Sequence, residues 1–347
     1  MRLVTSLPFP HIAFRHWTPD DSEGAVIIVK GSFGINSDGT LFLAHEQAPL
    51  VEVDLFHGDP ATSSLLAEQD LAPDKPRTDV TFALTARAPN GEAMPDWPVS
   101  VEIEGRAFYG FHVRGPSFWQ KQPSGSWRLT APQPVQTVPI RYELAFGGQA
   151  MSDDPPSVHL FNPAGTGFVT DRSLREQNLI PAPQIGELAE FVAGDVRAEM
   201  TVHGLGPIAK AWLPRRAEAG TFDEAWKSAR HPRMPADYSF AFWNAAPRRL
   251  QIDPYLRGGE RILLRGFHAA LEPQIVTLPA VGLTLRNTAG ALCPMNLTDV
   301  QIDMDSEDPA NHRVALIWRR FLGSADGEDT LHIETATIEA PAPETTS

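Results

Sequence analysis

Few residues of this sequence have the types and spacing that chemistry requires. The clearest candidate is Gly165-Thr166-Gly167, which resembles part of a phosphate-binding loop whose backbone N–H groups surround phosphate oxygens. The Gly-Lys-Ser/Thr continuation is missing, and no clean strand leads into the segment. An Asn-Pro turn beginning at Asn162, followed by glycines at positive φ, therefore explains Gly165 and Gly167 better than nucleotide binding does.

The acidic run from Asp303 to Asp308 spaces its carboxylates like the start of a calcium-binding loop. In such a loop a glycine makes the sharp turn and a bidentate glutamate closes the coordination sphere. Here Asp308 and Val314 occupy those two positions. A solvated acidic turn ahead of Pro309 is the better interpretation.

Local signatures of the common catalytic sites are missing from the sequence. It contains no Gly-x-Ser-x-Gly elbow, no His-Glu-x-x-His and no Cys-x-x-Cys, and its 11 histidines are scattered singly. Cys293, beside Pro294, has no evident activating neighbour. We therefore predict no catalytic residues, no cofactor, no metal site and no enzymatic activity.

One enzymatic alternative stays open at this point, because the two carboxylates of a glycoside hydrolase converge only in three dimensions. The eight tryptophans could supply a platform on which sugars stack, although most of them lie in apolar patterns typical of a core or an interface. A carbohydrate-binding or glycoside-hydrolase-like β-sandwich is therefore the alternative function.

The elements that must position these residues are mostly short strands. The 32 prolines exclude long helices, because an interior proline removes a helical N–H and clashes with the preceding turn. Apolar and polar residues alternate in segments punctuated by Pro and Gly, and Asp38-Gly39 is a hairpin signal. Strands are predicted at 25–33, 41–43, 80–86, 99–103, 139–146, 238–243, 261–267, 281–286, 299–304, 312–321 and 331–338. The pattern favours a mainly β protein of antiparallel sandwich or barrel-like sheets, with long Pro/Gly-rich loops and one or two short helices.

One helix is predicted from a capping box, with Thr221 as N-cap and Glu224 as its reciprocal partner, running to about Arg230. Weaker helical candidates are 62–70, as a helix or turn, and 184–191. The predicted organisation is an N-terminal β lobe (1–150), a long irregular connecting loop (151–195), a C-terminal β-rich lobe (196–339) and a disordered acidic tail (340–347).

Bulk properties restrict partners and compartment. A net charge of −14 argues against nucleic acid as a direct ligand, which requires a dense basic surface. No apolar stretch approaches the roughly 18 residues of a membrane span, and the N-terminus is a poor secretory signal. A single cysteine suits a reducing compartment, so we expect a cytoplasmic protein without membrane contact.

Several segments, taken in order, resemble the bacterial DUF2169 family over about residues 20–320. They include VKGSFGI at 29–35, DLAPDKPRTDV at 70–80, YELAFGG at 142–148, NPAGTGF at 162–168, WLPR at 212–215, GTFDEAW at 220–226 and RHPRMPADY at 230–238. One departure is the segment 202–205, VHGL, where relatives tend to have Pro-Ala-Gly-Phe.

The resemblance implies a cytoplasmic adaptor or chaperone of the type VI secretion system. Such proteins are encoded near the VgrG spike, PAAR-type tip proteins and a toxic effector, and are thought to help load the effector onto the spike. The expected partners are therefore an effector toxin, a VgrG/PAAR spike protein, or both. An acidic adaptor could also mask the basic groove of a nuclease effector.

Family-like residues have two possible roles. Lys75, Asp79, Arg215, Asp223 and Arg230 could form internal ion pairs that pin long loops, or they could contact a partner. Tryptophans at two of these motifs could anchor a partner or pack against the capped helix. We take as candidate partner-binding residues Trp212, Arg215, Asp223, Trp226 and Arg230, and as structural motif residues Lys75, Asp79, Asn162, Gly165 and Gly167.

Overall fold

The computed structural model describes residues 1–323 and 330–337 of the chain. Strands account for 40% and helices for 12% of the residues, and the sheets are largely antiparallel. The prediction of a mainly β protein with few, short helices is confirmed.

The largest sheet has seven strands and is built around the apolar run that follows Glu23. In spatial order its strands are β2 (His11–Trp17), β3 (Glu23–Ile35), β26 (Arg313–Gly323), β25 (Asn296–Asp303), β7 (Thr78–Ala83) and β20 (Gln251–Ile252), and β4 (Leu41–Leu43) pairs with the end of β3. β25 and β7 run parallel. The turn between β3 and β4 has Gly39 at φ +84°, as expected for the Asp38-Gly39 hairpin signal.

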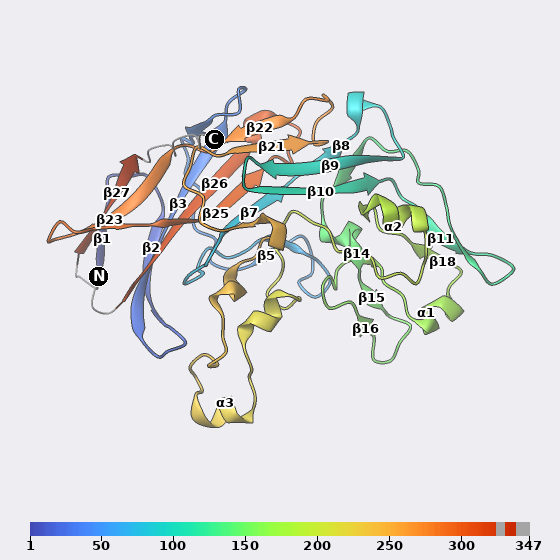
Figure 1. Ribbon diagram of the computed structural model, residues 1–347, viewed down its shortest axis with the longest axis horizontal. Coiled ribbons are helices and arrows are strands. Elements are labelled where there is room, and N and C mark those ends of the chain that lie inside the picture. Colours follow the sequence, from blue (N-terminus) through green and yellow to red (C-terminus); the bar gives the residue numbers. More distant parts are fainter. Residues whose placement is uncertain (324–329, 338–347) are drawn as a thin grey trace, which may run out of the picture.

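A five-stranded antiparallel sheet packs against one face of the seven-stranded sheet. Its strands are, in order, β19 (Ile185–Gly186), β10 (Ala107–Arg114), β9 (Asp96–Ile103), β21 (Arg261–Arg265) and β22 (Gln274–Thr277). Figure 1 shows β9, β10, β21 and β22 lying across β25, β26 and β7.

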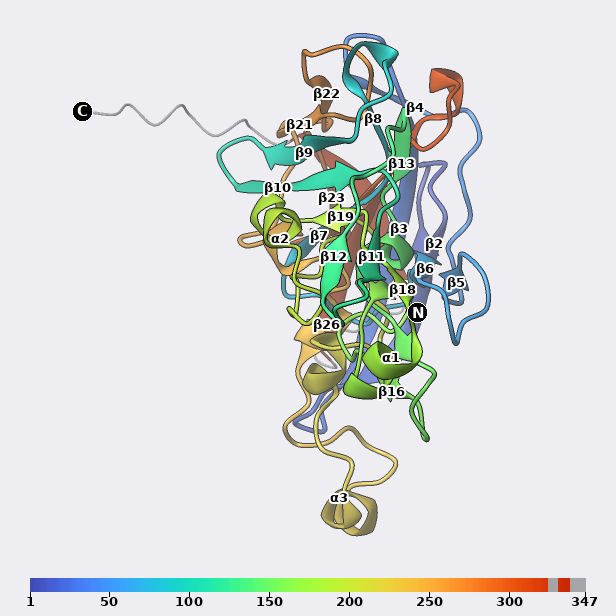
Figure 2. The ribbon, with the colours of Figure 1, turned by 90° about the vertical axis from the view of Figure 1, so that its right-hand side faces the viewer.

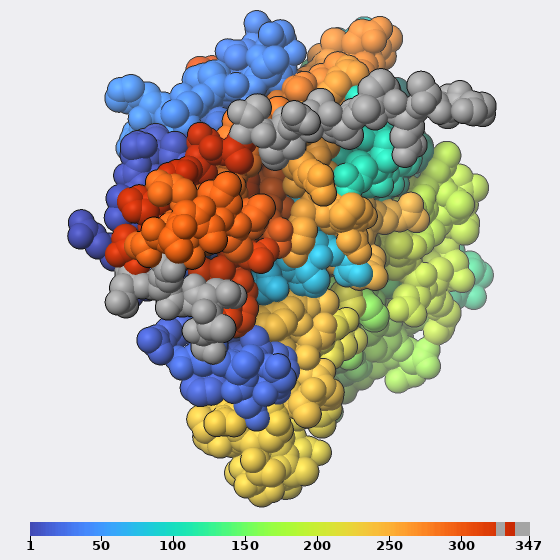
Figure 3. Space-filling view, turned by 60° about the vertical axis from the view of Figure 1, so that its left-hand side comes forward, coloured from blue at the N-terminus to red at the C-terminus, as the bar shows by residue number. Residues whose placement is uncertain are grey.

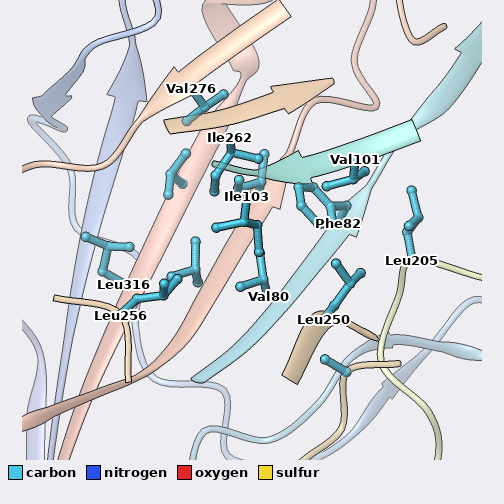
Figure 4. Close-up of a cluster of buried hydrophobic side chains, with 14 of the residues drawn as sticks. Val80, Phe82, Val101, Ile103, Leu205, Leu250, Leu256, Ile262, Val276 and Leu316 are labelled. Carbon is cyan, nitrogen blue, oxygen red and sulfur yellow. The ribbon is translucent and has the colours of Figure 1, made fainter. Parts of the chain in front are cut away.

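The main hydrophobic core fills the space between the two sheets. Because side chains alternate between the faces of a strand, every second residue points into this space. Figure 4 shows Val80 and Phe82 of β7 facing Val101 and Ile103 of β9, all of them buried. The arrangement is a β-sandwich, which is one of the two architectures predicted.

Smaller sheets surround the sandwich. One has the order β1 (Arg2–Val4), β27 (Thr330–Thr337), β23 (Val281–Asn287) and β24 (Leu292–Pro294), and another the order β12 (Trp127–Leu129), β11 (Phe118–Lys121) and β18 (Leu179–Pro181). The two-stranded pairs are β8 (Thr85–Arg87) with β13 (Thr137–Pro139), β14 (Phe146–Gly147) with β17 (Thr166–Gly167), β15 (Gln149–Ala150) with β16 (Ser157–Val158), and β5 (Leu55–Phe56) with β6 (Leu65–Ala67).

The α-helices of the described residues are short: α1 (Asp171–Glu176), α2 (Leu188–Ala193) and α3 (Glu224–Ala229). A helix is present in the predicted segment 221–230, but the predicted N-cap, Thr221, is wrong. Asp223 is the N-cap, and its carboxylate accepts a hydrogen bond from Trp226 N at 2.8 Å. Thr221 lies two residues before the N-cap position, and it donates its hydroxyl to Asp237 instead.

Several other predicted elements differ from the structure. The strand expected at 238–243 is a 3₁₀ helix, Phe240–Trp243, whose N-terminus is capped by Ser239. The strand expected at 139–146 is interrupted by a 3₁₀ turn, Tyr142–Leu144. In 62–70, predicted as a helix or a turn, the structure has the end of a turn followed by β6, whose Leu65 belongs to a buried cluster. In 184–191 the helix α2 begins only after β19.

Strands from the predicted N-terminal and C-terminal lobes lie in the same sheet. The seven-stranded sheet takes β2, β3, β4 and β7 from residues 1–150 and the remaining three strands from 196–339. The connecting region, 151–195, contains α1, α2 and several short strands. The acidic tail, 340–347, lies outside the described residues. No helix in the described part of the chain is long and apolar enough to cross a membrane.

Candidate functional site

Two regions contain six of the ten candidate residues singled out in the sequence. One is a buried ion network on the outer face of the seven-stranded sheet, the face turned away from the five-stranded sheet. The other is the segment 216–243, here called the arm, which carries α3 and stands away from the sandwich in Figures 1 and 2.

The ion network begins with two aspartates on neighbouring parallel strands. Asp79 of β7 and Asp299 of β25 are register partners, so their carboxylates lie side by side. Lys75 comes from the loop before β7 and places its ammonium between them, with Nζ 2.8 Å from Asp79 Oδ2 and 2.7 Å from Asp299 Oδ1. Glu68 Oε2 lies 3.2 Å from the same nitrogen.

Further partners close this network. Arg215 donates to the Glu68 carboxylate at 2.5 Å, and Arg319 donates to the Asp299 carboxylate. Asp79 also accepts hydrogen bonds from the Asn244 side chain and from the Ala245 backbone, at 2.9 and 2.7 Å. All six charged side chains are buried. Each buried charge therefore has an opposite partner, without which burial would be very costly.

The same charges hold the family-like loop 70–75 on the sheet. Arg319 donates to the carbonyl oxygens of Asp70 and Ala72, at 2.6 and 3.1 Å. Lys30 of β3 binds the Asp70 carboxylate at 2.8 Å. This loop has no regular hydrogen-bonded structure, so side-chain contacts to the sheet determine its shape.

Electrostatics keep Lys75 and Asp299 of this network ionised, whereas burial raises the pKa of the Asp79 carboxyl. Burial alone would lower the pKa of the Lys75 ammonium, but the Asp299, Asp79 and Glu68 carboxylates outweigh burial and raise it. Burial alone would raise the pKa of Asp299, but Arg319 and Lys75 lower it to about 2. A lysine that stays protonated at neutral pH cannot act as a nucleophile or a general base.

A cavity of about 280 Å³ lies above the network. Thr81 and Gln301 line its wall, and His57, Arg141 and Asp305 are among the other lining residues. Burial and the nearby Arg141 charge lower the pKa of the His57 imidazole. The polar lining could hold a hydrogen-bonding group.

The arm presents aromatic side chains at its tip. Figure 3 shows the arm (yellow) projecting from the body next to the hairpin of β2 and β3 (blue). Phe222 is 59% exposed and packs edge-on against Trp226, with 4.8 Å between ring centroids. The indole N–H of Trp226 donates to the Arg233 carbonyl at 2.8 Å, which fixes the ring across the tip.

Two arginines attach the arm to the turn between β2 and β3. Arg230 donates to the Pro19 carbonyl at 2.8 Å and to the Asp21 carboxylate at 3.2 Å. Arg233 pairs with the same carboxylate at 3.0 Å, and its guanidinium lies 5.3 Å from the centroid of the half-exposed Trp17 ring. The arm therefore projects from the sandwich in a defined orientation.

The base of the arm is also aromatic. Tyr238 contacts Phe240 and Phe242, with ring centroids 5.6 and 6.1 Å apart, and Phe242 contacts Trp243 at 5.5 Å. These four side chains are partly exposed. The Phe240 ring also lies 6.3 Å from His16 of β2. Aromatic side chains thus continue from the edge of the seven-stranded sheet onto the arm.

The five candidate partner-binding residues fall into two groups. Trp212 is buried with its ring against Tyr142, and Arg215 is buried in the ion network. Asp223 caps α3, whereas Trp226 and Arg230 are partly exposed on the arm. The structure therefore brings the second group together on an accessible surface and keeps the first group internal.

The glycine-rich segment forms a compact turn. Asn162 is buried and donates its side-chain amide to the carbonyls of Tyr142 and Phe146, at 2.8 and 3.0 Å. A Cβ on Gly165 would lie 2.4 Å from that amide nitrogen, and Gly167 has φ +97°. The positive φ expected from the Asn-Pro turn interpretation is confirmed for Gly167 but is wrong for Gly165, which must be glycine because neighbouring atoms leave no room for a Cβ.

The acidic run and the tryptophans have ordinary surroundings. Asp308 caps a 3₁₀ helix, Pro309–Asn311, as an acidic turn ahead of Pro309 would. Among the residues described, no cluster of three or more His, Cys, Asp or Glu side chains is arranged to hold a metal ion. Four of the eight tryptophans are buried and cannot stack on a sugar: Trp97, Trp119, Trp212 and Trp318.

Several residues of both regions were not predicted from the sequence. Glu68, Asp299 and Arg319 complete the ion network but lie outside the motifs chosen as sites. Trp17 and Phe222 are the most exposed aromatic residues around the arm. A signal for Phe222 was present, since it lies inside the GTFDEAW motif, whereas the contact between Trp17 and Arg233 joins segments more than 200 residues apart.

Comparison with known proteins identifies the family only. No significant match was found among curated proteins or among solved structures. A family model described as an uncharacterized protein conserved in bacteria (DUF2169) matches residues 20–319, most of the chain and both regions described above. This protein therefore belongs to the bacterial DUF2169 family.

Proposed function

We propose that this protein is a non-enzymatic, cytoplasmic adaptor of the bacterial type VI secretion system. It binds a toxic effector and helps to load that effector onto the VgrG/PAAR spike. Membership of the family and the resemblance of its motifs to secretion adaptors support the system, and the arm supports the mode of action.

The observation that carries this proposal is the exposed aromatic surface of the arm. Binding energy at protein interfaces is concentrated in a few Trp, Tyr and Arg side chains, together with the apolar residues around them. Phe222, Trp226 and Trp17 lie partly exposed beside Arg230 and Arg233 in this part of the molecule. Because Asp21 and Pro19 already hold the arginines, ordering the arm costs little entropy upon binding.

The direct test is co-purification of the protein with the VgrG, PAAR and effector proteins encoded beside its gene. We expect the wild-type chain to retain the effector. Phe222→Ala should weaken binding by about tenfold or more, the effect of losing one interface anchor. Retention of none of these neighbours by the wild-type chain would contradict the proposal.

The matched control is Phe108→Ala on β10. Phe108 is 60% exposed, almost the same as Phe222, but it lies away from the arm. If both substitutions weaken effector binding equally, the effect is one of general surface hydrophobicity and the arm is not the contact surface.

A further inference from the structure

The outer edge of β2 is the longest unpaired strand edge in the described part of the molecule. β2 has seven residues, and its pairing with β3 is continuous from His11 opposite Val29 to Trp17 opposite Glu23. None of its residues is fully buried. Among the described residues, none donates a backbone hydrogen bond to the outer side of this strand or accepts one from it.

The register shows which backbone groups face outward. Lys30 N donates to the Pro10 carbonyl at 3.0 Å, so the pair formed by residues 10 and 30 is hydrogen-bonded. Hydrogen-bonded and non-hydrogen-bonded pairs alternate in antiparallel sheets. Residues 12, 14 and 16 therefore bond to β3, and the N–H and C=O groups of His11, Ala13, Arg15 and Trp17 point away from the sheet.

Other sheet edges of the described chain are short or covered. β20 and β19 have two residues each, and β1, β24 and β12 have three. β22 has four, and its Thr277 N–H donates to the Gly39 carbonyl. Long, flat edges promote pairing between chains, and proteins usually interrupt them with proline, lysine or a bulge. Within its seven paired residues, β2 has no proline, lysine or bulge, and Arg15 is its one Lys, Arg, Asp or Glu residue.

The side chains of β2 are complementary to a second, antiparallel copy of the same strand. If two copies pair around Phe14, the outward-facing residue 11 lies opposite 17 and 13 lies opposite 15. Arg15 then faces the small side chain of Ala13, and no two like charges are opposed. Phe14 meets Phe14, and Ile12 meets His16, which are favourable cross-strand pairs.

We propose that the outer edge of β2 binds the β2 edge of a second copy of this chain. The two seven-stranded sheets join into one continuous sheet across a two-fold axis at Phe14, an isologous contact that closes on itself. The arm of each copy is attached next to its own β2–β3 turn. The two arms therefore lie at opposite ends of the joined edge, and the dimer offers two separate contact surfaces to its partners.

The test is analytical ultracentrifugation of the full chain over a range of concentrations. Arg15→Pro removes an outward N–H and leaves the hydrogen bonds to β3 in place, because the Arg15 N–H points away from β3. Arg15→Thr removes the same exposed side chain but keeps the N–H. We expect dimers for the wild type and Arg15→Thr, and a dimer about thirtyfold weaker for Arg15→Pro, since the two-fold axis doubles the loss of a single hydrogen bond.

A disulfide tests the register. With Cys293→Ser as background, Phe14→Cys should form a covalent dimer on oxidation, because residues opposed across a non-hydrogen-bonded pair are close enough for a disulfide. His11→Cys in the same background should not, since residue 11 lies opposite residue 17.

Two results would overturn the proposal. One is a wild-type chain that stays monomeric at every concentration. If Arg15→Pro, but not Arg15→Thr, then weakens the binding of that monomer to the neighbouring effector, the edge belongs to a strand of another protein. The other result is a dimer that Arg15→Pro and Arg15→Thr weaken equally. A dimer that retains no effector would support the edge contact and count against the adaptor function alone.

Discussion

The ion network and the arm are built from similar residues but are opposite in character. Arg215 in the network and Arg230 in the arm both bond to carboxylates and carbonyl groups, yet Arg215 is buried and Arg230 keeps part of its side chain in solvent. The network binds segments of the chain to one another, whereas the arm leaves aromatic and basic groups accessible. Family-like motifs thus contribute internal contacts in one region and, in the other, the accessible surface that we propose as the partner-binding site.

The strongest test of this contrast removes the central cation of the network. Lys75→Met leaves Asp79, Asp299 and Glu68 as neighbouring buried carboxylates with less compensation, so we expect a loss of about 3–5 kcal/mol in the free energy of unfolding. Urea denaturation measures it. Lys227→Met on α3, where the lysine is exposed, is the control and should change stability by less than about 0.5 kcal/mol.

If Lys75→Met is as stable as Lys227→Met, the network does not hold the outer face together and the contrast between the two regions fails. A soluble but partly unfolded Lys75→Met protein would still agree with the prediction, provided that hydrogen exchange increases first in β7 and β25, the strands that the network joins.

The second-largest effect is expected from acidification, which should weaken the ion network. The pKa of Asp299 is lowered to about 2 in the folded protein, from an ordinary value of 3.8. A lowered carboxyl pKa stabilises the folded state above the ordinary value, and this stability is lost as pH falls through the folded value. We expect about 2 kcal/mol to be lost between pH 5 and pH 2 from this group alone.

Urea unfolding over this pH range checks the acid prediction. Asp299→Asn should be less stable at pH 6 and should have a flatter pH dependence between pH 4 and pH 2. An equally steep dependence in that variant would mean that other carboxylates account for the acid sensitivity.

A smaller effect is expected where the arm meets the sandwich. Arg230→Met removes the hydrogen bonds to Pro19 and Asp21, so we expect a global loss of about 1 kcal/mol or less, because the side chain is partly exposed. Hydrogen exchange should rise in residues 221–234 and stay unchanged in β7 and β25. Faster exchange in the sandwich strands as well would show that the two regions form one cooperative unit.

The smallest effect concerns the cap of α3. Asp223→Ala should cost roughly 0.5–1 kcal/mol of local helix stability and expose the Trp226 amide to exchange, whereas Thr221→Val should leave that amide protected. Amide exchange of Trp226 distinguishes the two. If Thr221→Val exposes the Trp226 amide and Asp223→Ala does not, Thr221 is the N-cap after all.

Much of the fold could be predicted because its signals are local. Alternation in β7 and β9, and the Asp38-Gly39 turn, depend on neighbouring residues only. The strand predicted at 238–243 was wrong because its apolar run, Phe240–Trp243, forms a 3₁₀ helix that Ser239 caps. An apolar run of that length does not distinguish a strand from a turn of helix.

The site was only partly predictable. The candidates Trp212 and Trp226 are both tryptophans in family-like motifs, and nothing local indicates that the first is buried against Tyr142 while the second lies across the tip of an arm. Burial depends on what the rest of the chain places over a residue, which is a property of distant contacts.

The sequence by itself determined a mainly β protein, its DUF2169 family and the turns built on Asn162 and Gly39. Only the tertiary structure decided which charges are internal and which are available to a partner. Lys75 and Asp299 are 224 positions apart in the chain and 2.7 Å apart in space. An ion pair of this kind forms only after the sheet has brought its strands together, so residue type and spacing do not reveal it.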